Sequence, residues 1–202
     1  MKKHILYSIV ITAFIFASCS SYDSDYYLEQ SVFVSDPENP GLPEYSEWGY
    51  NTFGTYIDRQ AFTSDSYNLP AKIIVYGDTL NLLLTGSGGL FPTSTLKFSF
   101  IGFSPKEYTD LIELNNETID LTDKDKCIIT MIKSNETIEL TPFNGQFVFS
   151  RVQNLYVDNK LDKSIISGRF RFQTEYKNDY ITIDKGRFDF SIGYDNFYYI
   201  RR

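Results

Sequence analysis

Histidine and cysteine are almost missing from this chain of 202 residues. The only histidine is His4, so no imidazole after it can serve Ser-His-Asp or Cys-His catalysis, metal binding or a pH switch near neutrality. The two cysteines, Cys19 and Cys127, are too few for a framework of internal disulfides. Cys127 lies in the strand-like run KCIIT, where we expect a buried, unreactive thiol.

Positive charge is also scarce. The chain has 19 Lys and Arg against 26 Asp and Glu, which gives a net charge of −7 at pH 7. Proteins that bind nucleic acid need a basic face, so this balance argues against a nucleic-acid partner. It argues equally against electrostatic attachment to anionic lipids.

Motifs for cofactors and metals are lacking as well. The glycine-rich residues 86–89 are not followed by the Lys-Ser/Thr pair of a phosphate-binding loop. Asp120, Asp123 and Asp125 do not have the spacing of a calcium loop, and lysines stand between them. We therefore expect no cofactor and no metal site.

The N-terminus carries the most specific pattern in the chain. A basic start, Met1-Lys2-Lys3-His4, precedes the apolar residues 5–17, ILYSIVITAFIFA. This run is shorter than the roughly 20 apolar residues that a membrane-spanning helix needs, and its layout is that of a secretory signal peptide. We expect the signal peptide to comprise residues 1–18.

The end of this segment, Phe16-Ala17-Ser18-Cys19, resembles the lipobox of bacterial lipoproteins, with Phe16 where that motif usually has Leu. The resemblance implies that Cys19 is acylated and becomes the mature N-terminus, so that acyl chains hold the protein on a membrane. The alternatives are an ordinary signal peptide cut near Ala17 and an uncleaved membrane anchor. The following SSYDSD resembles the surface-export signal of Bacteroidetes lipoproteins, which implies an outer-membrane protein at the cell surface; a periplasm-facing protein stays open. The alternative is that SSYDSD is only part of a solvated tether.

Residues 19–46 have the composition of a tether. Pro37, Pro40 and Pro43 fall in the segment DPENPGLP, and proline fixes φ and lacks an N–H. This pattern predicts an extended, unpaired linker between the acylated Cys19 and a folded domain at residues 47–202.

The remainder has the pattern of an all-β domain. The chain holds 16 Tyr and 17 Phe, and many short runs alternate apolar with polar residues, as in AKIIVY, TLKFSF, GRFRF and GRFDFSI. We predict a single antiparallel β-sandwich or barrel-like domain, with at most one short helix between residues 104 and 114. The pair SGRFRF and KGRFDFSI resembles the closing strands of uncharacterised small β-domain lipoproteins of Bacteroidetes.

Aromatic rings are the main candidates for a binding site. Tyr and Trp offer a flat apolar face with a polar edge, which suits stacking on a sugar or anchoring a partner protein. The candidate residues are Trp48, Tyr50, Tyr56, Tyr194, Tyr198 and Tyr199. The alternative is that these rings fill the core and the outer face of the sheet.

A modification site is also expected from a resemblance. Asp78-Thr79-Leu80 is similar to the O-glycosylation acceptor of Bacteroidetes proteins, which implies a glycan on Thr79 at an exposed turn. The alternative is that these residues serve only to form the turn.

These observations predict a lipid-anchored, non-enzymatic binding module of the bacterial envelope, whose partner is a glycan or an envelope protein. Two alternatives stay open: a structural accessory subunit of a surface complex, and a hydrolase that uses a pair of carboxylates.

Overall fold

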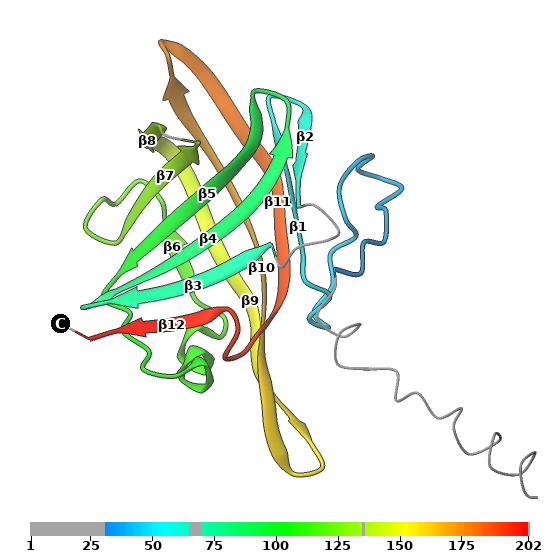
Figure 1. Cartoon of the computed structure of the whole chain (residues 1–202). Helices are drawn as coiled ribbons and strands as arrows, with labels where there is room; N and C mark the ends of the chain where they lie inside the picture. Colours follow the sequence, from blue (N-terminus) through cyan, green and yellow to red (C-terminus); the bar gives the residue numbers. More distant parts are fainter. Residues whose placement is uncertain (1–30, 65–69, 135, 202) are drawn as a thin grey trace, which may run out of the picture.

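The computed structural model describes residues 31–64, 70–134 and 136–201 (Figure 1). The predicted signal peptide and Cys19 lie outside these ranges. The described strands are β1 (Thr52–Ile57), β2 (Gln60–Thr63), β3 (Ala71–Tyr76), β4 (Thr79–Gly88), β5 (Phe91–Ile101), β6 (Thr118–Asp120), β7 (Cys127–Lys133), β8 (Glu136–Leu140), β9 (Pro142–Val157), β10 (Lys160–Tyr176), β11 (Asp179–Ile192) and β12 (Phe197–Ile200). The prediction of an all-β domain with one short helix is confirmed.

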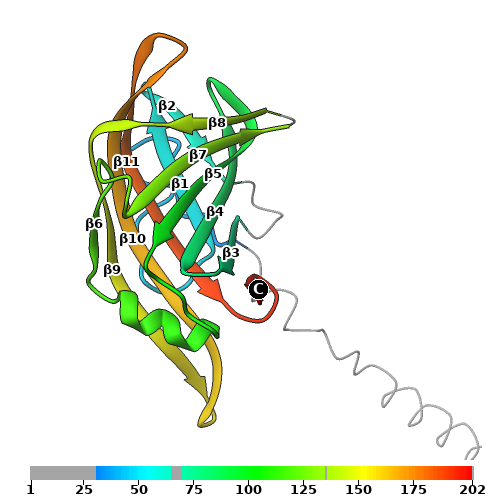
Figure 2. The same cartoon turned by 90° about the vertical axis from the view of Figure 1, so that its left-hand side faces the viewer.

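All twelve strands belong to one sheet, which folds over so that its two halves face each other (Figures 1 and 2). One half contains β6, β9, β10, β11, β1 and β2, and the other contains β12, β3, β4, β5, β7 and β8. The halves are joined by a single pair between β2 and β4, Thr63 with Ser87. Neighbouring strands are antiparallel except β12, which runs parallel to β3.

Phenylalanines fill the space between the two halves. The ring of Phe98 in β5 lies 4.8 Å from that of Phe147 in β9 and 5.2 Å from that of Phe170 in β10, centroid to centroid. Such tilted aromatic pairs contribute about 0.5–1.5 kcal/mol each beyond the area they bury. The period-two pattern of β5 and β10 thus points these side chains inward, as predicted.

The one described helix is shorter than the sequence suggests. The predicted range begins at residue 104, whereas the 3₁₀ helix η2 (Tyr108–Leu114) begins four residues later. The carboxylate of Asp110 accepts hydrogen bonds from the backbone N–H groups of Lys106 and Glu107, which fixes this later start. No helix within the described ranges is long and apolar enough to span a membrane.

Two charged side chains of β11 are buried, against the alternation of GRFDFSI. Arg187 and Asp189 are both on the outer face of the sheet, yet Asp189 is only 1% exposed. The reason is that residues 31–50 lie over this face as a further layer. Leu42, which is fully buried, belongs to that layer.

Asp189 is the point at which this layer is fastened. Its carboxylate accepts hydrogen bonds from the backbone N–H groups of Trp48 (3.2 Å), Gly49 (2.8 Å) and Tyr50 (3.1 Å). It also accepts from the hydroxyls of Ser46 and, at 2.8 Å, Ser167 of β10. Five donors on one buried carboxylate compensate for its removal from water.

Glycine is required where the layer touches the sheet. Gly49 has φ +78°, and a Cβ there would clash with Ser191 Oγ. Gly54 of β1 has no side chain to obstruct Pro43, whose Cδ would lie 2.5 Å from a Cβ at Gly54. The close contact of layer and sheet therefore depends on both residues.

A second fastening joins Asp36 to Arg187. The guanidinium donates to the Asp36 carboxylate and to Pro43 O. The Asp36 carboxylate also accepts from Asn39 Nδ2 at 2.7 Å and from the Glu38 N–H at 2.8 Å. The Asn39 amide and then Arg187 hold the pKa of Asp36 down, from 3.8 to about 2, against the opposing effect of desolvation.

These contacts differ from the predicted tether of residues 19–46. Residues 31–46 are not an unpaired linker, because side chains of Asp36 and Ser46 and the apolar Leu42 bind them to the sheet. The part of the predicted tether before residue 31 lies outside the described ranges.

Replacing Asp189 with Ala is expected to lower the free energy of unfolding by at least about 3 kcal/mol, because several buried donors lose their acceptor. Asp189→Asn, which keeps one acceptor oxygen, should lose less. Urea unfolding of both variants measures the effect, with Asp195→Ala in the exposed loop after β11 as the control. A midpoint for Asp189→Ala equal to that of the control would contradict the role of this carboxylate.

Acid is expected to release the layer. Because the pKa of Asp36 is lower in the folded protein, its contribution is complete above about pH 4 and is lost as the pH falls from 3.8 to about 2. Pepsin is active in this range, so cleavage within residues 31–50 should rise there. Asp36→Asn should be cleaved at every pH tested, whereas Glu38→Gln should behave like the unmodified protein. Cleavage of Asp36→Asn with the same pH profile as the unmodified protein would rule out this linkage.

Candidate functional site

The layer formed by residues 31–50 leaves part of the outer sheet face uncovered, across β1, β11, β10 and β9. Two rows of side chains cross these strands in register. The first row contains the pair Tyr56 and Asp184 and the pair Arg171 and Gln146, with a register shift between β11 and β10 where the two pairs meet. The second row contains Asp58, Thr182, Gln173 and Asn144. Tyr56 is the only aromatic residue among them, and the rest are polar.

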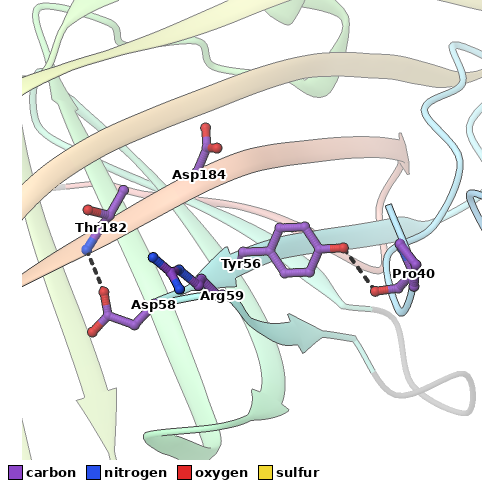
Figure 3. Close-up of a pocket in the computed structure, with 6 residues that line it drawn as sticks. All are labelled: Pro40, Tyr56, Asp58, Arg59, Thr182 and Asp184. Carbon is purple, nitrogen blue, oxygen red and sulfur yellow. Dashed lines mark hydrogen bonds between the residues drawn. The ribbon is translucent and has the colours of Figure 1, made fainter. Parts of the chain in front are cut away.

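A hollow of about 800 Å³ opens over the β1 end of these rows (Figure 3). It is lined by Pro40, Tyr56, Asp58, Arg59, Thr182 and Asp184. A smaller hollow of about 230 Å³ adjoins it on the β10 side and shares Thr182 and Asp184 with it. The shared residues make the two hollows one continuous candidate site.

Hydrogen bonds to backbone fix two of the lining side chains. Tyr56 donates its hydroxyl to Pro40 O at 2.9 Å, which holds the ring along the edge of the covering layer (Figure 3). Asp58 accepts from the Thr182 N–H at 2.9 Å. Asp58 and Arg59 form the tight turn between β1 and β2 with φ values of +46° and +68°, so the turn itself aims both residues at the site.

Irregular pairing also shapes this region. The register shifts between Gly54 and Tyr56 in β1, and between Phe170 and Phe172 in β10. A bulge increases the local twist of a strand and re-aims its side chains, and Arg171 lies at the second one. In both pairings the extra residue is in β11 itself, next to Asp184, where Lys185 has φ +55°.

The polar side chains at the centre are not used by the fold. Within the described ranges, the side chains of Arg59, Arg171, Gln173 and Asp184 make no hydrogen bond or ion pair. The site has no net charge, because it contains two carboxylates, Asp58 and Asp184, and two guanidinium groups, Arg59 and Arg171. Donors and acceptors of this kind suit a ligand with many hydroxyl groups, since a hydroxyl both donates and accepts.

The six aromatic candidates from the sequence do not form one site. Tyr56 alone lines the hollow. Trp48, which is 71% exposed, and Tyr50 lie in the covering layer beside Asp189. Asp189 is five residues from Asp184 along β11, or about 17 Å.

The other three aromatic candidates lie outside the strands that form the site. Tyr194, which is 84% exposed, packs its ring at 5.0 Å on Tyr108 of η2. Tyr198 and Tyr199 are on β12 at an edge of the other half of the sheet, with Lys72 Nζ 5.4 Å from the Tyr198 ring. These residues stay candidates for separate contacts rather than for one stacking platform.

Thr79 lies at the start of β4, directly after the turn that joins it to β3. Its hydroxyl donates to Asp78 Oδ1 at 3.1 Å. Its glycosylation stays a prediction.

The remaining sequence candidates lie in turns or in the core. Asp120 and Asp123 accept hydrogen bonds from nearby Thr122 and Asp125 within their own turns, and in the part of the chain that the structure covers no three acidic or thiol side chains gather as a metal site would need. Cys127 is buried, and burial raises the pKa of its thiol to about 12. A thiol with that pKa stays protonated near neutrality and reacts slowly.

Sequence reasoning missed the polar residues of the site. Alternation in GRFRFQ and in YITID predicts that Arg171, Gln173, Thr182 and Asp184 point outward, but most outward residues of a sheet are polar. Nothing in the pattern distinguishes them from Arg187 and Asp189, which are covered.

Comparison with models of known protein families, with curated proteins and with solved structures found no match for this chain.

Proposed function

We propose that the protein is a lipid-anchored binding module of the bacterial envelope, and that it binds a glycan on the open outer face of the sheet. The observation that carries this proposal is the pair of polar rows beside Tyr56, whose central side chains have no partner in the described fold. A surface built only for solubility does not need a hollow with aligned donors and acceptors.

The chemistry of the site supports a sugar more than other small ligands. Sugar rings present hydroxyl groups at the edge and C–H groups on the face. Asp184 accepts, Arg171 donates, and the amide of Gln173 does both, while the Tyr56 ring offers an apolar surface for the C–H groups. The balance of charges suits a neutral ligand.

The lipid anchor in this proposal depends on the N-terminal sequence. Acylation of Cys19 after removal of residues 1–18 would leave about a dozen residues before Val32, where the covering layer begins with a hydrogen bond to Tyr50. Outer-membrane attachment at the cell surface follows from the resemblance to Bacteroidetes lipoproteins.

A second candidate is a module that binds an envelope protein, as in an accessory subunit of a surface complex. It is favoured by an exposed apolar patch on the covering layer, which consists of Val32, Phe33, Val34, Trp48 and Tyr50. The backbone brings the two parts of this patch together, since Val32 N–H donates to Tyr50 O at 2.8 Å. Tyr and Trp are the residues most often found as anchors of protein interfaces.

Glycan binding is expected to depend on Tyr56 and Asp184. We would apply the full-length mature protein, purified in detergent, to a glycan array and then test the variants Tyr56→Ala and Asp184→Asn. Each should weaken binding at least about tenfold, as loss of one aromatic or charged hydrogen-bonding contact does. Tyr156→Ala, which removes an exposed ring at the far end of β9, should bind normally.

An array without any bound glycan would reject the proposed ligand. Cross-linking of a membrane protein through the patch around Trp48 would then support the second candidate. Release of shorter sugars from a bound glycan, abolished in Asp184→Asn, would instead indicate a carboxylate hydrolase.

The anchor has its own test. Cys19→Ala should abolish incorporation of labelled fatty acid and move the protein from the membrane to the soluble fraction, because the acyl chains are its only proposed attachment. Cys127→Ala is the matched control and should remain acylated. An unchanged membrane fraction for Cys19→Ala would exclude acylation at this residue as the anchor.

A further inference from the structure

We propose that the site takes a linear oligosaccharide of about three sugar rings, which lies across the strands from β1 to β9. This inference rests on the proposed function and adds the size and direction of the ligand.

The site is long in the direction across the strands. Tyr56 is opposite Asp184 and Arg171 is opposite Gln146, and Asp184 and Arg171 line one hollow across the register shift between β11 and β10. Neighbouring strands are about 4.8 Å apart, so this row extends over about 14 Å. The two adjoining hollows follow the same direction, since the first includes β1 residues and the second includes Asn144 of β9.

In the direction along the strands, side chains bound the site at both sides. On one side, the Arg169 guanidinium stacks 3.9 Å from the ring centroid of Tyr45, which belongs to the covering layer. On the other side, Phe143 and Tyr180 pack against each other with their ring centroids 5.5 Å apart. Two rows of outward residues lie between these barriers, and the two rows are about 7 Å from each other.

Two rows of hydrogen-bonding groups that cross four strands fit a chain molecule better than a single ring. One sugar ring covers about one strand spacing, so a single sugar would contact only one end of the strip. Three rings in a line would reach from the Tyr56 ring, over Asp184 and Arg171, to the amides of Gln146 and Asn144. A branched or globular ligand would meet the barriers at Tyr45 and Tyr180.

The two ends of the strip have different chemistry. The β1 end has the Tyr56 ring and the charged groups of Asp58 and Arg59. The β9 end has only the neutral amides of Gln146 and Asn144, on exposed positions. A ligand of one or two rings is therefore expected at the β1 end, where stacking and charged hydrogen bonds act together.

Calorimetry with oligosaccharides of increasing length tests this inference. The probes are β-1,4-linked glucose, β-1,4-linked xylose, α-1,4-linked glucose and α-1,6-linked mannose, each from one to six rings, titrated into the full-length mature protein. For at least one series, affinity should rise at least tenfold from one ring to three and change less than twofold from three to six.

Two variants at opposite ends separate the subsites. Gln146→Ala should weaken binding of the three-ring probe at least fivefold and leave the two-ring probe unchanged, whereas Tyr56→Ala should weaken both. Gln153→Ala, seven residues farther along β9 and about 23 Å away, is the matched control and should change neither.

The possible failures point to different conclusions. Two results would overturn the extended site and leave glycan binding intact. One is an affinity that depends on Tyr56 but does not increase beyond one ring, and the other is an affinity for the three-ring probe that Gln146→Ala does not change. The absence of binding in all four series would overturn both proposals.

Discussion

The carboxylate of Asp189 is the constraint on which the outer side of the molecule depends. Burying a charge in a protein is costly unless donors replace the water around it, and Asp189 gains five of them. Three are consecutive backbone N–H groups of residues 48–50, so the chain can satisfy the charge in only one local conformation. That conformation needs Gly49 at φ +78°. The first strand therefore begins from a fixed point rather than from a free linker.

Fastening at Asp189 divides the outer face into a covered part and an open part. From residue 46 back to residue 36 the chain crosses the sheet to Arg187, whose guanidinium pairs with Asp36. Between these two points the layer passes over β1, where Pro40 O accepts from Tyr56. The boundary of the open face is thus the edge of the layer, and Tyr56 contributes to both. The candidate site exists where the layer stops, so its position follows from how residues 36–46 are held.

The side chains that face the core could be predicted from the sequence, and the role of those that face outward could not. Phe98, Phe170 and Phe188 are apolar at period two, and that pattern alone determines that they face a core. Asp184 and Asp189 stand in the same strand at outward positions with the same side chain, yet one lines a hollow and the other is buried. The difference comes from contacts with residues 46–50, more than 130 positions earlier in the chain. A local sequence pattern carries no information about contacts at that separation.

The covering layer was missed for a related reason. Its three prolines and several acids have the composition of an unpaired linker, because composition reports average behaviour. The stabilising contacts come from a few particular residues, among them Leu42 in the interior and Asp36, which forms a turn with Asn39. The local signals were an apolar residue, Leu42, between two prolines and an Asp, Asp36, three residues before an Asn. Both patterns are too common in proteins to outweigh the composition of the segment.

The same division explains why aromatic content alone is a poor guide to function here. The largest fully buried side chains are mostly phenylalanines, whereas among the described tyrosines only Tyr108 belongs to the core. A tyrosine hydroxyl needs a partner or water, so these rings stay near the surface whether or not they bind anything. What distinguishes Tyr56 is its setting beside polar side chains that the fold leaves unpaired.

The covering layer also links the proposed anchor to the proposed site. If acyl chains on Cys19 hold the protein on the membrane, any pull on the bound ligand passes through the sheet to Asp189 and Arg187, and from there along residues 31–50 to the anchor. The contacts of this layer are charged or buried hydrogen bonds, which are stronger than those of an exposed linker. They lie between the anchor and β1, so the sheet and the hollow are protected from a force that would otherwise act on the first strand. If the protein holds a glycan chain while it is anchored, this layer gives a mechanical advantage that an unpaired tether would not provide.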